Sequence, residues 1–182
     1  RNLQIDKLRD GVEAMIDSIT RNPSAFNWLR EIKRKDDYAY HHALACSVWA
    51  ASFGRHLGLN RGELTVLTLA GLLFEVGKIR MPPEILGKSA NYDDHDHETM
   101  RGHVQHGIDI LGSLDGVSPR IIDAVATHHE RHDGSGYPKG LIGGAIPIYG
   151  RIIGLIDSYD AMTSMRSHKR SRSPHQVVME LC

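Results

Sequence analysis

The chain has 182 residues, in which 22 Lys and Arg balance 22 Asp and Glu, with two cysteines and 12 histidines. This length is enough for one domain with a hydrophobic core. The balanced charge argues against binding to DNA or to a membrane surface, and two cysteines form neither a disulfide framework nor a zinc cluster. The sequence contains no run of about 18 apolar residues, so we expect no transmembrane helix and a cytoplasmic location.

Apolar residues recur at helical spacing along almost the whole chain, and we predict an all-α bundle in one domain, residues 23–182. The amphipathic pattern of residues 1–22 ends at Pro23 and is interpreted as a connector helix from a missing upstream region. We expect the domain to be truncated at its C-terminus. A glycine-rich loop is predicted at 131–146. The predicted helices of the domain are 24–32, 37–58, 61–75, 83–86, 93–111, 119–130, 148–162 and one from residue 174.

Metal-capable side chains accompany several of these helices. The string HHERHDGSGYP places His128 and His129 at a helix end, before the glycine-rich loop. Adjacent helical residues diverge by about 100°, so both imidazoles reach one centre only if it lies over the helix end. Imidazoles and carboxylates without a thiolate suit iron, manganese or zinc. The candidates on other helices are His42, Glu75, His103 and Asp157.

Other readings stay open for some of these residues. Glu75 follows an apolar helix, and a buried carboxylate is costly unless it is paired or bound to a metal. It either joins a metal site, pairs with Lys78 or turns to solvent. His42 directly follows another histidine, His41, so an alignment shifted by one residue would place His41 at the ligand position instead. Cys46 is interpreted as a small buried thiol, and His95 and His97 as part of an exposed acidic helix start.

The strongest motif is HHERHDGSGYPKGL, which matches the pattern HHExxDGxGYP at all eight fixed positions. IRMPPEILGK, HVQHGIDIL and RIIGLIDSYDAMTSMR occur with it at similar spacing. Residues 24–180 therefore resemble an HD-GYP domain, of the bacterial branch of the HD superfamily that hydrolyses cyclic di-GMP. The resemblance implies an all-α HD-type bundle, a divalent metal centre and cyclic di-GMP as ligand. It also implies a Gly-Tyr-Pro loop that contacts partner proteins such as diguanylate cyclase domains.

The resemblance also implies roles for individual residues. Glu75 stands at the position of a metal-bridging carboxylate, and with Lys78 it would act in catalysis. Phosphate and nucleoside contacts would come from Lys78, Tyr137, Arg166 and Lys169. The implied metal ligands are His42, Glu75, His103, His128, His129 and Asp157.

One departure from the family pattern changes the expected function. The His-Asp pair should stand in LLHDVGK, but this chain reads LLFEVGK, with Phe74-Glu75 in its place. A phenyl ring offers no lone pair, and Glu reaches one methylene further than Asp. We therefore expect one metal site rather than two, with iron or manganese preferred and zinc accepted, because two-metal hydrolysis needs both ions held close together.

The predicted function is an HD-GYP-type domain of cyclic di-GMP signalling with impaired hydrolysis, acting in ligand binding or protein interaction. One alternative is an active metal-dependent phosphodiesterase that gives pGpG or GMP. Another is a non-catalytic structural scaffold. The presence of Lys78, Tyr137, Arg166 and Lys169 argues against the scaffold, because a site without a ligand has no physical need of these side chains.

Overall fold

The computed structural model describes residues 23–88, 92–164 and 172–181, and this part of the chain is helical with no strand. The predicted all-α class is confirmed. One isolated bridge pairs Asp133 with Ile142 in the glycine-rich loop. The predicted connector at 1–22 lies outside the described residues. In chain order the elements are α2 (Pro23–Lys35), α3 (Asp37–His56), α4 (Arg61–Leu73), the 3₁₀ helix η1 (Val76–Arg80), α5 (Pro83–Leu86), α6 (Asp94–Arg101), α7 (His103–Gly112), α8 (Pro119–Thr127), the 3₁₀ helix η2 (Gly143–Ala145), α9 (Ile148–Thr163) and α10 (Pro174–Leu181).

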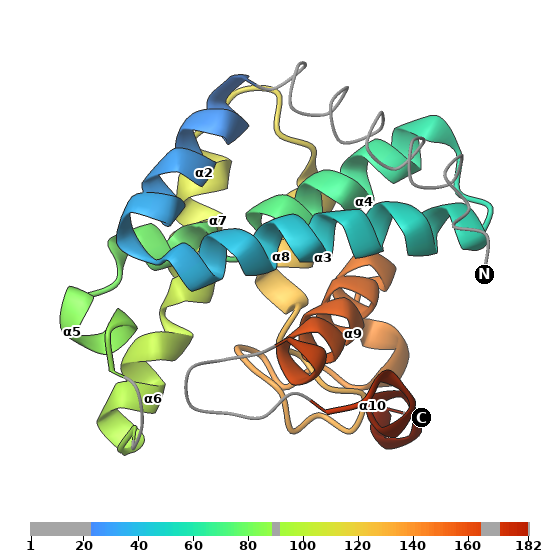
Figure 1. The fold of residues 1–182 in the computed structure, drawn as a ribbon. Coiled ribbons are helices and arrows are strands. Elements are labelled where there is room, and N and C mark those ends of the chain that lie inside the picture. Colours follow the sequence, from blue (N-terminus) through green and yellow to red (C-terminus); the bar gives the residue numbers. More distant parts are fainter. Residues whose placement is uncertain (1–22, 89–91, 165–171, 182) are drawn as a thin grey trace.

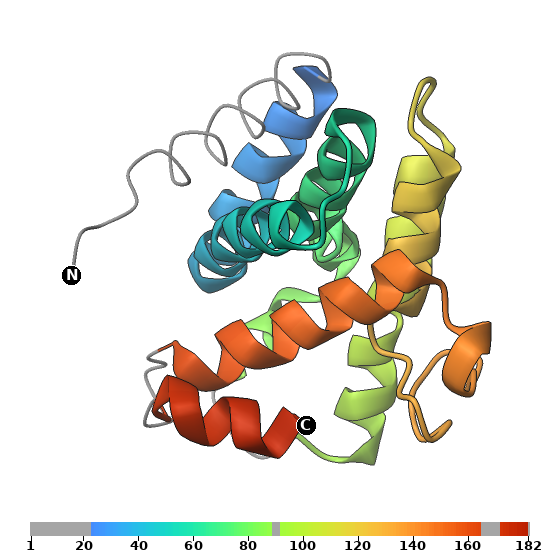
Figure 2. The same ribbon diagram turned by 90° about the vertical axis from the view of Figure 1, so that its right-hand side faces the viewer.

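The helices pack around an antiparallel pair formed by α3 and α4 (Figure 1). Helix α2 packs on α3, and α8 packs between α4 and α9. Helix α9 crosses below α3, and α10 folds back along α9 (Figure 2). The segment η1 lies against α7. As a result α3, α7, α8, α9 and the end of α4 meet near the centre of the molecule.

Local side-chain hydrogen bonds start several of these helices. The Asp36 carboxylate accepts from the Ala39 backbone N–H at the start of α3. Asn60 and Glu63 form a capping box that starts α4. Such bonds satisfy backbone donors that have no partner inside the helix. The helix starts could therefore be read from the sequence.

Two glycines allow the close packing that brings the central elements together. A Cβ atom on Gly77 of η1 would lie 1.8 Å from the carbonyl oxygen of His103. A Cβ on Gly154 of α9 would lie 2.4 Å from the carbonyl oxygen of His128. Both distances are far below van der Waals contact, so larger residues would push α7 and α8 away. The backbone of both histidines is therefore fixed by direct contact with neighbouring elements.

The hydrophobic core fills the space between α3, α4, α8 and α9. Phe74 is its largest fully buried side chain, with 0% of its surface exposed. The burial of such a ring contributes about 1.5–3 kcal/mol to stability. Core residues that share this environment are Cys46, Ala50, Leu67, Leu72, Val76, Ile110, Val125, Ile152 and Ile153.

Helix α2 continues to Lys35, three residues beyond its predicted end, and α3 ends at His56, two residues before its predicted end. Three further predicted boundaries, each beside a candidate ligand, were wrong. The expected helix 93–111 is two helices, α6 and α7, with a tight turn at Gly102, whose N–H bonds to the Thr99 carbonyl. Helix α8 ends at Thr127 instead of residue 130, because the chain turns into the loop there. Helix α4 ends at Leu73 instead of residue 75, and η1 follows it. Each correction falls beside a candidate ligand, where contacts between elements override helical periodicity.

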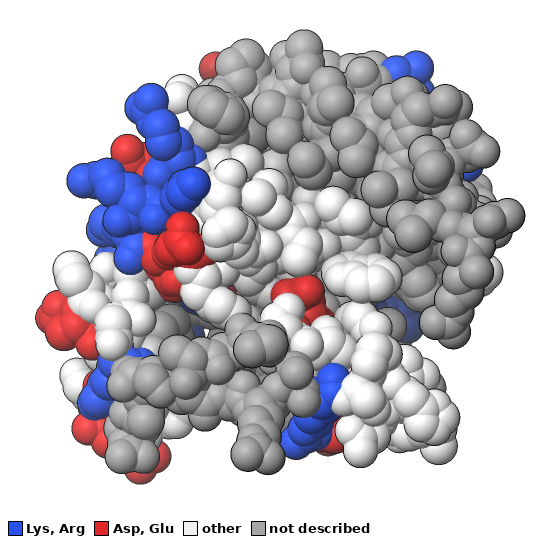
Figure 3. All heavy atoms as spheres, viewed as in Figure 1, with Lys and Arg blue, Asp and Glu red and all other residues white. Residues whose placement is uncertain are grey.

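Charged side chains are mixed over the surface seen in Figure 3, with a group of Lys and Arg over α2. The last turn of α2 carries Lys33, Arg34 and Lys35. Among the helices that the structure describes, none is both long and apolar enough to cross a membrane.

Candidate metal centre

Three histidines from two helix ends converge on one point. His103 is the first residue of α7, whereas His128 and His129 directly follow α8. One ring nitrogen of each lies within 4.8 Å of the other two. We call His103, His128 and His129 the three-histidine cluster. The structure brings these predicted ligands together over the end of α8, as two adjacent histidines require if they serve one centre.

Backbone carbonyls orient two of these imidazoles. The Nδ1–H of His103 donates to the Met100 carbonyl at 2.6 Å, and that of His128 donates to the Val125 carbonyl at 2.7 Å. A carbonyl only accepts, so each Nδ1 carries the proton and each Nε2 keeps its lone pair. The two Nε2 atoms face each other at 3.4 Å. Burial lowers the pKa of both rings, that of His128 to about 4, so both are neutral at neutral pH.

Glu75 lies between Lys78 and the three-histidine cluster. Its Oε1 pairs with the Lys78 ammonium at 2.7 Å, and its Oε2 lies 3.5 Å from Nε2 of His103. This buried Oε2 accepts no hydrogen bond from the described part of the chain. Burial by itself would raise the pKa of Glu75, but Lys78 and the histidines hold it well below its usual range. The carboxylate is thus an anion that pairs with Lys78 and also faces the histidines.

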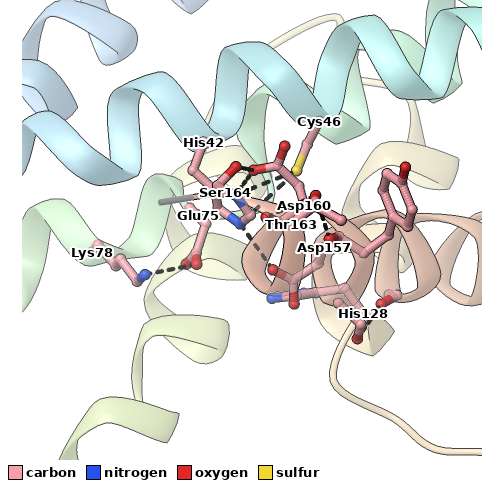
Figure 4. A network of polar contacts seen from close by, with 12 residues as sticks. His42, Cys46, Glu75, Lys78, His128, Asp157, Asp160, Thr163 and Ser164 are labelled. Carbon is pink, nitrogen blue, oxygen red and sulfur yellow. Dashed lines mark hydrogen bonds and ion pairs between the residues drawn. The ribbon is translucent and has the colours of Figure 1, made fainter. Parts of the chain in front are cut away.

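A second group of metal-capable side chains lies where α3 meets α9 (Figure 4). The Nε2 of His42 bonds to Oδ1 of Asp157 at 2.9 Å, and its Nδ1 bonds to Oδ2 of Asp160 at 2.7 Å. The thiol of Cys46 lies 3.7 Å from Nδ1. Burial alone would lower the pKa of His42, but the two carboxylates raise it to about 12. We call His42, Cys46, Asp157 and Asp160 the α3–α9 cluster.

Sequence reasoning missed two members of the α3–α9 cluster, Cys46 and Asp160. Cys46 is fully buried, as expected, but it also lies one helical turn from His42. Asp160 follows Asp157 by three residues on α9. Residues three or four apart share a helix face. This spacing from the predicted ligands His42 and Asp157 was the signal that could have found both.

Phe74 lies between the two clusters. Its ring centroid is 5.6 Å from that of His42 and 5.1 Å from that of His128, and both contacts are edge-to-face. The ring is fully buried and offers no lone pair to an ion. The phenyl ring therefore fills the space between His42 and His128 with apolar carbon.

Tyr137 of the glycine-rich loop covers the outer side of the three-histidine cluster. Its ring stacks on His129 with centroids 4.5 Å apart, and the Arg101 guanidinium lies 5.1 Å from the ring centroid of Tyr137. Glu130 holds this loop by accepting from the backbone N–H groups of Lys139 and Leu141 at 2.8 Å. The Tyr137–Pro138 peptide bond is cis.

Two predicted substrate residues, Arg166 and Lys169, lie outside the described residues. His95 and His97 are exposed at the start of α6, as expected.

Comparison with known proteins identifies the fold. The profile of the HD-domain family matches residues 14–181. This chain belongs to the HD-domain family. The domain is 33% identical over 172 residues to a cyclic di-GMP phosphodiesterase of Pseudomonas aeruginosa, a match that covers 94% of this chain and 42% of the relative. It is 30% identical over 174 residues to the 3'3'-cGAMP-specific phosphodiesterase 2 of Vibrio cholerae, covering 94% of this chain and 33% of the relative.

These relatives place the HD domain in the HD-GYP branch of the family, and the chain spans less than half of the length of either. Solved structures share the fold of this HD domain. The HD domain of the L. monocytogenes phosphodiesterase PgpH in complex with cyclic-di-AMP superposes with a TM-score of 0.64 at 18% identity, covering 85% of this chain and 80% of that one. An HDG"Y"P protein from Bdellovibrio bacteriovorus, Bd1817, gives a TM-score of 0.65 at 18% identity, covering 78% and 45%.

Proposed function

We propose that this HD domain binds one divalent cation at the three-histidine cluster and presents it to a cyclic dinucleotide that it hydrolyses poorly or not at all. The observation that carries the proposal is the position of Phe74. Its ring lies against both His42 and His128 and offers no lone pair, so one of two adjacent ions would lack a ligand at this position. The domain would then act by binding its ligand or a partner protein.

The donor atoms of the three-histidine cluster fit a cation. Two neutral imidazoles direct lone pairs toward each other at 3.4 Å, and an unbonded carboxylate oxygen of Glu75 faces them. Convergent electron pairs repel each other unless a positive charge lies between them. Nitrogen and oxygen ligands suit iron or manganese, and zinc is accepted. A cation held there would polarise a phosphate oxygen and lower the pKa of a bound water.

Impaired hydrolysis follows from the ligand that Phe74 does not supply. Two-metal hydrolysis of a phosphodiester needs ions about 3.5–4 Å apart that stabilise the attacking and leaving oxygens together. Phe74 fills the space between the two clusters with carbon, and Lys78 holds one Glu75 oxygen at 2.7 Å. A single cation at the three-histidine cluster would stabilise one of the two oxygens.

The relatives support a cyclic dinucleotide as the ligand, and cyclic di-GMP in particular. Those named above act on cyclic di-GMP or 3'3'-cGAMP, and a structural neighbour is described with cyclic-di-AMP. Lys78 and Tyr137 lie beside the three-histidine cluster and would contact the phosphates and a nucleoside. We assign further phosphate contacts to Arg166 and Lys169. The glycine-rich loop carries the Gly-Tyr-Pro motif and an Ile142 side chain that is 67% exposed. This loop would contact a partner protein such as a diguanylate cyclase domain.

Manganese stoichiometry and turnover of cyclic di-GMP test this proposal together. The protein is purified without chelator or histidine tag, stripped of metal and reloaded with Mn²⁺. We expect one Mn²⁺ per chain, no spin-coupled manganese pair and little or no pGpG or GMP. The double variant Phe74→His, Glu75→Asp restores the family pair and should gain a coupled pair and faster turnover.

Two outcomes would contradict the proposal. A coupled manganese pair with turnover in the unaltered protein would favour an active phosphodiesterase. This alternative has support in the Glu75 oxygen that already faces the histidines. Failure of both proteins to bind Mn²⁺ or cyclic di-GMP would favour a structural scaffold.

A further inference from the structure

Arg101 lies at the outer edge of the three-histidine cluster, and the family resemblance gives it no role. It is the last residue of α6, and Gly102 separates it from His103, the first residue of α7. Its guanidinium lies over the ring of Tyr137, with Cζ 5.1 Å from the ring centroid. Tyr137 in turn stacks on His129 with centroids 4.5 Å apart. The three side chains therefore form one layered stack that ends on a candidate metal ligand.

A row of contacting side chains connects this stack to Lys78. The Lys78 ammonium pairs with Glu75 at 2.7 Å, and the other Glu75 oxygen lies 3.5 Å from Nε2 of His103. The rings of His103 and His129 then contact each other with centroids 5.1 Å apart. The row thus has a lysine ammonium at one end and the Arg101 guanidinium at the other.

These two cations differ in exposure and in shape. The Lys78 side chain is 17% exposed and carries a compact point charge, which suits a phosphate. The Arg101 side chain is 54% exposed and presents five N–H donors in one plane. One of its nitrogens donates to Glu98 at 3.5 Å, and an exposed pair of this length is weak. The guanidinium is therefore available to a ligand.

The position of Arg101 favours a nucleobase as that ligand. A phosphate of a bound dinucleotide belongs at the cation, beside Lys78. Tyr137 lies between the three-histidine cluster and Arg101, on the side that we assign to a nucleoside. A guanidinium stacked on an aromatic ring keeps its N–H donors at its edge, where a planar ligand can approach them.

The donors of Arg101 fit guanine better than adenine. Guanine presents two neighbouring acceptors, O6 and N7, whereas adenine presents N7 beside the N6 amino donor. Two parallel N–H groups therefore bond both guanine atoms, but on adenine one of them meets another donor. Relatives of this domain act on cyclic di-GMP or 3'3'-cGAMP, and both of these molecules contain a guanine.

We propose that Arg101 is a specificity-determining residue that donates two hydrogen bonds to O6 and N7 of one guanine of the dinucleotide. This assignment rests on the proposed function, because it needs the dinucleotide at the three-histidine cluster. It adds how the domain distinguishes guanine from adenine. A bidentate contact of this kind discriminates against the wrong base by roughly 5–150-fold.

Calorimetric titration of the Mn²⁺-loaded protein with cyclic dinucleotides tests the inference. Arg101→Met keeps an apolar stem over Tyr137 and removes every N–H donor. We expect this variant to bind cyclic di-GMP and 3'3'-cGAMP roughly 5–150-fold more weakly, and to change the affinity for cyclic-di-AMP by about twofold or less. Cyclic di-IMP keeps O6 and N7 but lacks the 2-amino group of guanine, so it should show the same loss as cyclic di-GMP.

Arg120→Met is the matched control variant. Arg120 is also exposed, and its guanidinium lies 6.0 Å from the ring centroid of Tyr149. It stands in the first turn of α8, at the opposite end of that helix from the three-histidine cluster. This substitution should leave the affinities for all four dinucleotides unchanged.

The inference and the proposed function can fail separately. An equal loss for cyclic di-GMP and cyclic-di-AMP in Arg101→Met would make Arg101 a general phosphate contact, and unchanged affinities would leave it without a ligand. Either result would overturn the inference while binding of Mn²⁺ and the dinucleotide still supports the proposed function. A matching loss of Mn²⁺ affinity would make Arg101 a support of the three-histidine cluster and would also overturn the inference. Unaltered protein that binds Mn²⁺ but no dinucleotide would overturn both.

Discussion

One phenyl ring contacts a histidine of each cluster, yet one histidine is neutral and the other is protonated. His103 and His128 donate to backbone carbonyls and keep their Nε2 lone pairs free. His42 is held by carboxylates on both nitrogens and keeps two protons. The first arrangement leaves nitrogen lone pairs free for a cation, whereas in the second two carboxylates balance the charge of the imidazolium. Burial is similar in both, so the partner groups decide the difference.

Protonation should show the largest contrast between the clusters. In metal-free protein we expect His42 to stay charged as the pH rises through the ordinary histidine range, because its pKa is raised to about 12. His128 should stay neutral until the pH falls to about 4. Histidine ring NMR over a pH titration measures both. A normal titration of His42 near neutral pH would remove the proposed contrast.

The ring that separates the clusters should contribute strongly to stability. Phe74→Ala leaves a cavity in the fully buried core, and we expect the free energy of unfolding to fall by about 3–5 kcal/mol. Phe74→Leu keeps most of the volume and should cost about 1.5 kcal/mol or less. Urea denaturation compares the two variants. Equal, small losses would mean that Phe74 does not support the packing between the clusters.

Removing one ligand should affect one cluster and leave the other unchanged. His128→Ala should weaken Mn²⁺ binding at least about 10–100-fold, because an imidazole that faces the ion is lost. His42→Ala, on the other side of Phe74, should leave Mn²⁺ affinity within a few-fold of the unaltered protein. Calorimetric titration with Mn²⁺ measures both. A similar loss in both variants would show that the clusters act as one site.

The smallest effect is expected at the outer face of the three-histidine cluster. Tyr137→Ala removes the ring stacked on His129, an interaction worth about 0.5–1.5 kcal/mol, and should weaken Mn²⁺ binding by up to roughly tenfold. Tyr137→Phe keeps the stack and is the matched control. Tyr137→Phe should therefore bind Mn²⁺ like the unaltered protein, and an equal loss of affinity in both variants would show that the stacked ring does not support the three-histidine cluster.

Part of the site could be predicted from the sequence because its signals are local. Helical periodicity and helix-end signals predicted the α-helices, with α6 and α7 taken as one, but not the 3₁₀ helices η1 and η2. The adjacent pair His128-His129 predicted a centre over a helix end. The turn at Gly102 was missed because the Met100 carbonyl just before it also accepts from the His103 imidazole, a contact that helical periodicity does not include. Cys46 was interpreted as core packing because a small thiol among apolar residues is usually buried, although its four-residue spacing from His42 already placed both on one face of α3.

The sequence by itself determined the all-α class, the HD-GYP resemblance and the presence of Phe74-Glu75 where a His-Asp pair is expected. The tertiary structure alone decided that Phe74 lies between two groups of ligands, that Glu75 faces both Lys78 and His103, and that Asp160 holds His42. Periodicity and motifs act within one element, where neighbouring residues set the pattern. The direction of a buried side chain depends on the packing of α3 on α9 and of η1 on α7, which brings together residues far apart in the chain.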